Sequence, residues 1–369
     1  MLRILVESDH YLKIVPVMLD PKTPAEHARA VADFFAHDLD FPSWCEAFRS
    51  RVPGLYPAKI EFAEDQHEFD AKLADADLAI VESLSVTREV LAKSERLLAV
   101  QKFGAVPNGI DAEACAEKLI AVLTLRREVN IAVAEQAFTL LMALSKRIGE
   151  LSGVVTEKHL HGKGYQTRPY DRRYTGGSNY ARIPGLRTLF GSTLGIVGLG
   201  EVGREIAARA NAFGMSVVYF QRRRVAPFDE MGLGARYLPL NELMANSDYI
   251  VVQLPLTDST RGIIGRTALS AVKPGAILIN AARAALVDRD ALIEALDSGR
   301  LGGLGMDVGY DEPWAPGDPL LRYNQGNVIL MPHTAIGHRK NGLNDLAEMC
   351  LGLWRAAFGR KRLKTPQPR

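Results

Sequence analysis

Short apolar runs that suit β-strands alternate with segments of helical period along almost all of the 369 residues. The alternation becomes regular after about residue 190, where a helix is expected at 201–213 and strands at 192–197, 216–220, 249–253, 276–280, 305–308 and 328–331. Strands that are separated by helices pair in parallel. The pattern therefore predicts an α/β protein with doubly wound parallel sheets.

The remainder of the chain follows the same pattern less regularly. Strands are expected at 1–8, 78–81 and 97–101, a helical excursion at 20–56, an irregular connector at 154–187, a closing helix at 342–358 and a disordered basic tail from 359. The segment 130–148 is apolar on more than one face, which is typical of a helix buried between domains or subunits. At about 150 residues per domain, the length favours two unequal domains.

The composition limits the classes of partner. The chain has 45 basic and 43 acidic residues, and the resulting net charge of +2 is too small for the broad basic surface of a nucleic-acid binder. No apolar run approaches the roughly 18 residues of a membrane span, and the amino terminus lacks the pattern of a signal peptide. Cys45, Cys115 and Cys350 match no metal spacing and are expected to be ordinary small apolar residues. We therefore expect a cytoplasmic protein that binds neither membranes nor nucleic acid.

The segment GLGEVG at 198–203 follows an apolar strand and opens a helix. Glycines at this spacing suit a dinucleotide site, because Gly198 permits a tight turn, Gly200 lets the backbone approach a pyrophosphate and Gly203 allows close packing of helix and strand. The amides at the start of the helix supply donors to the phosphates. The alternative is a glycine-rich turn without a ligand.

The end of the second strand distinguishes NAD from NADP. An NAD site places an acidic residue there, on the ribose 2′-hydroxyl. This chain instead reads YFQRRR at 219–224, where guanidinium groups can bind a 2′-phosphate. The sequence therefore favours NADP(H), and NAD(H) stays possible if the arginines only form a solvated basic turn.

Three side chains with complementary chemistry each follow a predicted strand: Arg283, Glu312 and His333. Since the carboxyl ends of parallel strands share one edge of a sheet, these groups can converge. An arginine can hold a substrate carboxylate, a histidine can exchange a proton at the adjacent oxygen, and a glutamate can orient and stabilise the protonated imidazole. This set suits hydride transfer at a carbon beside a carboxylate, although each residue alone is more often a surface, loop or structural group. His159 and His161 have no third ligand nearby in sequence, so no metal site is expected.

These residues lie in stretches that resemble the D-isomer-specific 2-hydroxyacid dehydrogenases. The stretches are LLAVQKFGAVPNGID at 97–111, VNIAVAEQAFTLLMAL at 129–144, GSTLGIVGLGEVGREIAARANAFGM at 191–215, QLPLTDSTRGIIG at 253–265, NAARAALVDRDAL at 280–292, GMDVGYDEP at 305–313 and PHTA at 332–335. The resemblance implies two α/β domains around a cleft, with a Rossmann cofactor domain (129–336) inserted into a flavodoxin-like substrate domain (1–128 and 337–369).

The resemblance also implies roles for individual residues. Arg283 would hold the substrate carboxylate, His333 would be the general acid and base, Glu312 would be its partner, and the loop 102–108 would cradle the carboxylate through backbone amides. The implied substrate contacts are Phe103, Gly104, Ala105, Val106 and Arg283. The implied cofactor contacts are Gly198, Gly200, Glu201, Val202, Gly203, Gln221, Arg222, Arg223, Leu254, Pro255, Ala281, Ala282, Arg283, Asp307 and His333.

Some positions depart from the family pattern. Gln136 and Gln253 stand where histidines are usual, and we expect neither to bear on the chemistry. Arg126 and Arg127 replace a proline-glycine turn; they could widen the range of anions bound or form an exposed pair. The arginines keep a 3-phosphoglycerate dehydrogenase open as the alternative to a glyoxylate or hydroxypyruvate reductase. A non-catalytic, dinucleotide-sensing corepressor is the alternative from another class, and the helix at 130–148 predicts a homodimer.

Overall fold

The computed structural model describes residues 1–323 and 326–362, without the side chains of 360–362. The chain divides into two compact units, and the second is inserted into the sequence of the first. Unit 1 consists of Met1–Asn130 and Ile336–Arg369, and unit 2 of Ile131–Ala335.

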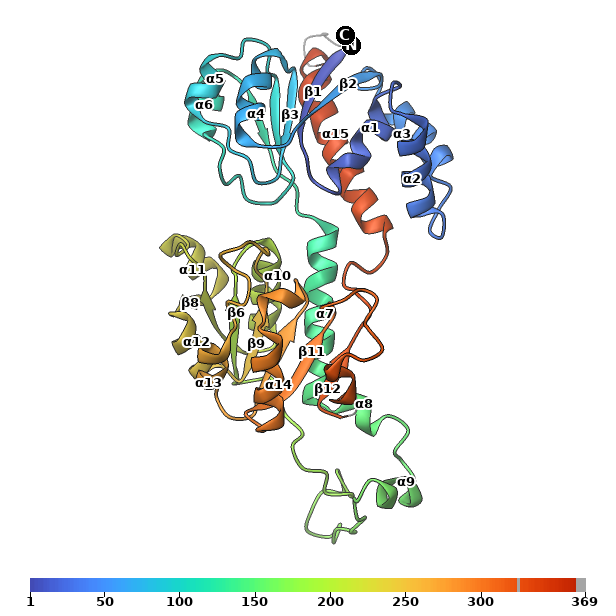
Figure 1. Ribbon diagram of the computed structural model, residues 1–369, viewed down its shortest axis with the longest axis vertical. Coiled ribbons are helices and arrows are strands. Elements are labelled where there is room, and N and C mark those ends of the chain that lie inside the picture. Colours follow the sequence, from blue (N-terminus) through green and yellow to red (C-terminus); the bar gives the residue numbers. More distant parts are fainter. Residues whose placement is uncertain (324–325, 363–369) are drawn as a thin grey trace. The chain divides into compact units, whose positions relative to one another are not determined.

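Unit 1 is built on a five-stranded parallel sheet (Figure 1). Its strands are β1 (Leu2–Glu7), β2 (Ala58–Ala63), β3 (Leu78–Val81), β4 (Ala99–Lys102) and β5 (Ala121–Leu123). They are arranged in the order β2-β1-β3-β4-β5, which is the flavodoxin-like order. All residues of β3 and β4 are buried, as expected for central strands covered on both faces.

Seven helices of the described chain belong wholly to unit 1. They are α1 (Val15–Leu19), α2 (Ala25–Phe35), α3 (Phe41–Arg51), α4 (Gln66–Lys72), α5 (Arg88–Ala92), α6 (Ala112–Glu117) and α15 (Lys340–Arg362). The predicted excursion at 20–56 is helical, and the rings of Phe35 and Phe41 stack at 5.1 Å between α2 and α3. The long helix α15 buries Leu346 and Leu353 in the same core cluster as β1 and β3.

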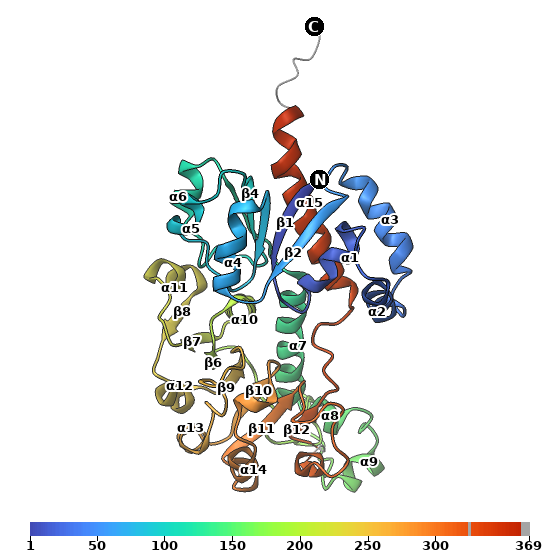
Figure 2. The same ribbon diagram turned by 45° about the horizontal axis from the view of Figure 1, so that its top comes forward.

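Unit 2 is built on a seven-stranded parallel sheet, whose strands are labelled in Figure 2. Its strands are β6 (Thr193–Val197), β7 (Ser216–Phe220), β8 (Ala235–Tyr237), β9 (Tyr249–Val252), β10 (Ala276–Asn280), β11 (Leu301–Met306) and β12 (Val328–Leu330). The order β12-β11-β10-β9-β6-β7-β8 is the Rossmann arrangement extended by one strand. The predicted class of two doubly wound parallel sheets is thus confirmed.

The helices of unit 2 include α7 (Glu128–Ser145), whose first turn lies at the boundary of the units, and α10 (Glu201–Ala212), which follows β6 directly. The others are α8 (Ile148–Leu151), α9 (Glu157–Gly162), α11 (Pro227–Leu233), α12 (Leu240–Asn246), α13 (Arg266–Ala271) and α14 (Arg289–Asp297). Nothing in the described part of the chain combines the length and hydropathy of a membrane-spanning helix.

Several local predictions are wrong. The short strands β2, β5 and β8 were not foreseen, and β11 begins and ends earlier than the predicted 305–308, because its glycines lower the apparent strand propensity. The connector at 154–187 contains the short helix α9. Helix α15 continues to Arg362, so the first residues of the predicted disordered tail are helical; residues 363–369 lie outside the described chain.

Candidate active site

The three glycines of the loop between β6 and α10 have the backbone geometry expected from the sequence. Gly198 has φ +108°, and a Cβ there would lie 2.2 Å from the carbonyl oxygen of Gln253. A Cβ on Gly203 would lie 2.2 Å from the carbonyl oxygen of Gly198, so helix and turn are in close contact. Gly200 begins α10 as its N-cap, and apart from its chain neighbours no atom of the described residues lies within 4 Å of its Cβ position. The loop is therefore packed at two glycines and open at the third, where a ligand can approach the backbone.

The basic turn after β7 exposes all three of its arginines, but only Arg224 is paired with a carboxylate among the described residues. Arg224 forms an ion pair with Glu230, and the hydrogen bonds from Arg224 and Tyr219 lower the pKa of Glu230 to about 2. Arg222 and Arg223 are exposed, and neither has an ion pair with any residue that the structure describes. The backbone N–H of Gly198 donates to the carbonyl of Phe220 (2.8 Å), which places this turn beside the glycine loop.

Gln253, which directly follows β9, carries an unsatisfied donor beside the same loop. Its backbone N–H donates to Val197 (2.8 Å), but its side-chain Nε2 is buried without a hydrogen-bond partner in the described chain. A buried amide without a partner is costly, and such groups are usually completed by a ligand or water. Leu254 and Pro255 continue from this position at the same strand end. The open Gly200 and the orphaned Gln253 donor both fit a dinucleotide.

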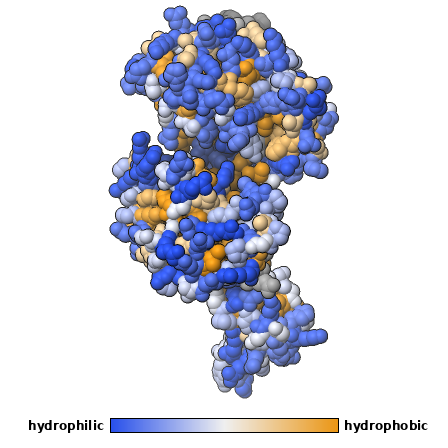
Figure 3. Space-filling model, viewed as in Figure 1, coloured by the Kyte–Doolittle hydropathy of each residue, from blue (hydrophilic) through white to orange (hydrophobic). Residues whose placement is uncertain are grey.

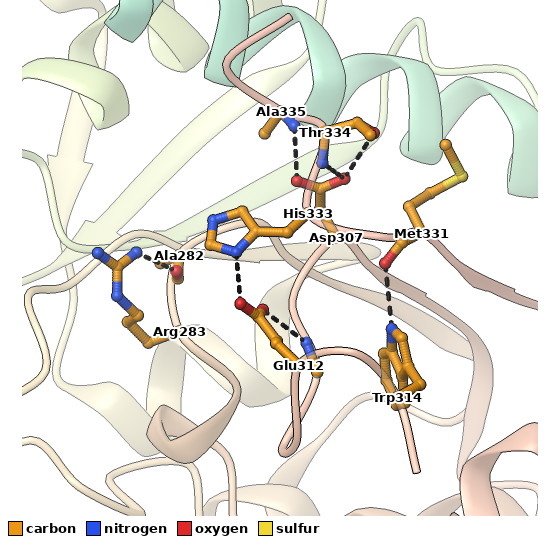
Figure 4. Close-up of polar contacts among 10 residues, drawn as sticks. Ala282, Arg283, Asp307, Glu312, Trp314, Met331, His333, Thr334 and Ala335 are labelled. Carbon is orange, nitrogen blue, oxygen red and sulfur yellow. Dashed lines mark hydrogen bonds and ion pairs between the residues drawn. The ribbon is translucent and has the colours of Figure 1, made fainter. Parts of the chain in front are cut away.

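His333 and Glu312 form a pair (Figure 4). The imidazole Nδ1 lies 2.8 Å from Glu312 Oε2, and the backbone N–H of Gly309 donates to the other carboxylate oxygen at 3.2 Å. Burial raises the pKa of the Glu312 carboxyl, but the hydrogen bonds from His333 and Gly309 and the charge of Arg283 outweigh it, so that the net pKa lies below its ordinary value. The His333 and Glu312 side chains are 40% and 44% exposed, which leaves both accessible to a small molecule.

Arg283 follows β10 on a turn that a buried asparagine holds. Asn280 is fully buried; its Oδ1 accepts from the Ala282 N–H (3.1 Å) and its Nδ2 donates to the Arg283 carbonyl (2.9 Å). The exposed guanidinium of Arg283 donates to the Ala282 carbonyl at 2.7 Å. The carboxyl ends of β10, β11 and β12 thus bring Arg283, Glu312 and His333 to one edge of the unit 2 sheet.

Asp307 lies between β11 and the His333 loop and is completely buried. Its oxygens accept from the side chains of Thr334 and Gln136 and from the backbone amides of Thr334 and Ala335. The sequence gives no sign that Gln136 contacts Asp307, because the two residues are 171 positions apart and no local pattern connects them. Reasoning from the sequence also missed Trp314, whose indole N–H donates to the Met331 carbonyl (3.2 Å) and connects the Glu312 and His333 loops.

The predicted substrate loop, from Phe103 to Val106, belongs to unit 1 and follows β4. The Phe103 N–H donates to Val81, and the Leu125 N–H donates to the Gly104 carbonyl, both at 2.7 Å. The Arg127 guanidinium lies 4.0 Å from the centre of the Phe103 ring and 3.9 Å from Asp345. The interpretation of Arg127 as an exposed residue is wrong, because its side chain is only 13% exposed.

The three cysteines are free and buried, as predicted. Among the described residues no group of three or more His, Cys, Asp or Glu side chains is placed to hold a metal ion. His159, which was considered as a ligand, has its Nδ1 3.1 Å from the Gly153 carbonyl.

Comparisons with known proteins identify the family. The model of the D-isomer specific 2-hydroxyacid dehydrogenase NAD binding domain matches residues 139–335. A glyoxylate reductase of Thermococcus onnurineus is 34% identical over 304 residues, which are 79% of this chain and 84% of that protein. A D-3-phosphoglycerate dehydrogenase of Methanocaldococcus jannaschii is 34% identical over 271 residues, which are 73% of this chain and 47% of that protein.

Two solved structures share the fold along nearly the whole chain. The glyoxylate reductase from Paecilomyes thermophila has a TM-score of 0.54 and 25% identity, covering 97% of this chain and 95% of that one. The D-lactate dehydrogenase of Aquifex aeolicus, solved with NAD and lactic acid, has a TM-score of 0.52 and 26% identity, covering 98% and 96%. The chain belongs to the D-isomer specific 2-hydroxyacid dehydrogenase family of oxidoreductases.

Proposed function

We propose that this protein reduces a 2-oxo acid to the D-2-hydroxy acid, and catalyses the reverse oxidation, with a nicotinamide dinucleotide. The observation that carries the proposal is the 2.8 Å pair of His333 and Glu312 beside Arg283 at one strand edge. Protonated His333 donates its proton from Nε2 to the 2-oxo oxygen, because Nδ1 is engaged with Glu312. Arg283 binds the substrate carboxylate and polarises the carbonyl, and its guanidinium suits a bidentate contact.

The residues around the glycine loop would hold the dinucleotide, which when bound supplies the hydride to C2. The amides at the start of α10 would bind the pyrophosphate, with Gly200 as the point of closest approach. Gln221, Leu254 and Pro255 follow β7 and β9, and Ala281 and Ala282 follow β10. The chain therefore has possible contacts at three strand ends around the loop.

NADP(H) is the cofactor that the turn after β7 favours. A carboxylate that would repel a 2′-phosphate is missing at 221–223, and Arg222 and Arg223 are exposed cations free of ion pairs with described residues. Arg224 is less suited to this role because its guanidinium is already paired with Glu230. NAD(H), which the matched family domain binds, is the alternative.

Unit 1 would contribute the contacts to the substrate. We assign the substrate domain to unit 1 and the cofactor domain to unit 2. Within unit 1 we assign the backbone amides of Gly104 to Val106 to the substrate carboxylate, because the Phe103 N–H already donates to the Val81 carbonyl. The loop is well suited to this task because hydrogen bonds to Val81 and from Leu125 fix its backbone.

An absorbance assay at the nicotinamide band tests the proposal with a panel of 2-oxo acids. Glyoxylate, hydroxypyruvate, pyruvate and 3-phosphohydroxypyruvate are each tested with NADPH and NADH. Turnover of an unphosphorylated acid supports the proposal. Preference for the phosphorylated acid would instead indicate a phosphoglycerate dehydrogenase, and dinucleotide binding without turnover of any acid would indicate a sensing protein.

We further propose that the protein is a homodimer through unit 2. Apolar side chains are exposed around residues 148–213, among them Ile148 (52%), Val155 (68%) and Phe190 (77%). Figure 3 shows scattered apolar residues at the surface of the segment that includes Val155, within a mostly hydrophilic face. These exposed apolar side chains, together with helix α7, which is apolar on more than one face, support an interface with a second copy of the chain. Light scattering after gel filtration should give about twice the chain mass of 40.5 kDa, and the mass of a single chain would contradict this.

A further inference from the structure

We propose that Gln136 is a positioning residue for the reaction: its side-chain amide holds the Asp307 carboxylate in the orientation that fixes the turn carrying His333. The inference rests on the proposed role of His333 and concerns a contact that the sequence had not suggested. Gln136 lies on α7, one of the elements packed against the unit 2 sheet.

The His333 turn needs external support. His333 has φ +54°, the left-handed region, which is unfavourable for a residue with a side chain and persists only where neighbouring contacts hold it. The next two backbone amides supply these contacts, since Thr334 N donates to Asp307 Oδ1 at 3.1 Å and Ala335 N donates to Oδ2 at 2.7 Å (Figure 4). The Thr334 hydroxyl adds a bond to Oδ1 at 3.3 Å. The orientation of the Asp307 carboxylate therefore sets the direction of His333.

Gln136 is the one donor to the Asp307 side chain, among the described residues, that does not come from this turn. Its Nε2 lies 3.1 Å from Oδ1, and Asp307 has no cation beside it in the described chain. A fully buried carboxylate needs its hydrogen bonds to stay ionised and in place. Hydrogen bonds from the turn cannot by themselves orient the carboxylate that holds the turn. Two contacts orient Asp307 independently of the turn: its own backbone N–H donates to the Asn280 carbonyl, and Gln136 donates to its side chain.

The packing of α7 does not depend on this amide. Ala134, Ala137 and Leu141 on the same helix are buried to 2% exposure or less and hold α7 on the sheet. Gln136 itself is only partly buried. Loss of the amide should therefore change the position of His333 and leave the fold and the dinucleotide loop as they are.

Two variants of nearly equal size test the role in the full-length protein. Gln136→Met removes the donor, and we expect kcat for 2-oxo acid reduction to fall about ten-fold, while KM for the acid and Kd for the dinucleotide change by less than about three-fold. Gln136→Glu places a second carboxyl group against Asp307. When protonated, it can donate the missing hydrogen bond; when ionised, it repels Asp307. Its kcat relative to the wild type should therefore rise as the pH falls, whereas the ratio for Gln136→Met should not depend on pH.

The titratable groups near this contact are few. Among the described residues, Asp307 accepts only from neutral donors. His333, which precedes Thr334, and its partner Glu312 are unchanged in every variant. On α7, Glu135 pairs with Arg209 of α10 at 3.2 Å. Thr139→Val is the matched control, because Thr139 is exposed on α7 and its hydroxyl bonds, within the part of the chain that the structure describes, only to the Glu135 carbonyl. The control should keep the kcat and pH profile of the wild type.

Each outcome decides between the possibilities. Wild-type kcat in Gln136→Met, or a parallel loss of kcat, dinucleotide affinity and thermal stability, would overturn the inference. If Gln136→Met does not fold, Gln136→Glu decides alone, and a pH-independent ratio to the wild type overturns it. If the proposed function itself fails, the wild type shows no turnover of any 2-oxo acid, which distinguishes that failure from a failure of the role of Gln136.

Discussion

Replacing Glu312 by Gln removes the negative charge beside His333 and keeps a side chain of the same shape. Two unit charges about 4 Å apart attract by ~1 kcal/mol in bulk water and ~4 kcal/mol at an effective dielectric constant of 20. Both side chains are about two-fifths exposed, which places this pair near the lower figure. Since ~1.4 kcal/mol corresponds to one pH unit, the substitution should shift the protonation of the catalytic pair by roughly one unit.

The direction of this shift follows from the chemistry. The lowered pKa of the Glu312 carboxyl keeps it ionised at neutral pH, where it favours the protonated imidazole. In the proposed reaction the reduction requires that protonated form, so reductive activity should be present at low pH and be lost as the pH rises. In Glu312→Gln the half-loss of reductive kcat/KM should move to lower pH by roughly one unit. Oxidation uses the unprotonated imidazole, so the pH below which oxidative kcat/KM is lost should also move lower by roughly one unit.

The assay is the pH dependence of kcat/KM in both directions, with dinucleotide binding measured separately. Asp311→Asn is the matched control, because it removes the same charge from the adjacent, exposed position. The prediction is wrong if the pH of half-loss of kcat/KM in Glu312→Gln equals that of the wild type, or if Asp311→Asn shifts it by the same amount.

Four further variants test the cofactor site. Arg222→Ala with Arg223→Ala should weaken NADPH binding at least about ten-fold and NADH binding by less than about three-fold; equal losses in isothermal titration would contradict the 2′-phosphate assignment. Gly200→Ala should weaken dinucleotide binding without a change in melting temperature, whereas Gly203→Ala should lower the melting temperature, because its Cβ meets a carbonyl oxygen at 2.2 Å. Gln253→Leu should weaken dinucleotide binding and raise the stability of the free protein by about 1 kcal/mol in urea, and a stability loss would show that Nε2 has a partner.

The fold could be predicted because it depends on local pattern. The central strands β6, β9 and β10 are continuous apolar runs. In the GLGEVG segment the turn is followed directly by the helix, so adjacent residues are enough to predict both. The short edge strand β8 was missed because three residues carry little pattern, and β11 was misplaced because Gly302, Gly303 and Gly305 look unlike a strand. These glycines are needed for close packing, which only the neighbouring strands and helices reveal.

The site could be predicted as a set of residue types at strand ends, but not as a network. The placement of Arg283, Glu312 and His333 follows from the rule for parallel sheets. The contact of Gln136 with Asp307 joins positions 171 apart, and the pairing of Arg224 with Glu230 depends on the course of α11. Such contacts depend on tertiary packing and cannot be predicted from the local sequence pattern.

The most direct test of the proposed reaction is a single-turnover measurement with His333→Gln beside the wild type. With a 2-oxo acid that carries a side chain, such as pyruvate or hydroxypyruvate, and limiting NADPH or NADH, the wild type should form one D-2-hydroxy acid for each dinucleotide oxidised, as measured by absorbance and chiral chromatography. His333→Gln should keep dinucleotide affinity within about three-fold of the wild type, since His333 is only one of many implied contacts. It should lose nearly all product formation, because no group remains to donate the proton. Product formation by His333→Gln at the wild-type rate, or the L-isomer as the product, would contradict the account.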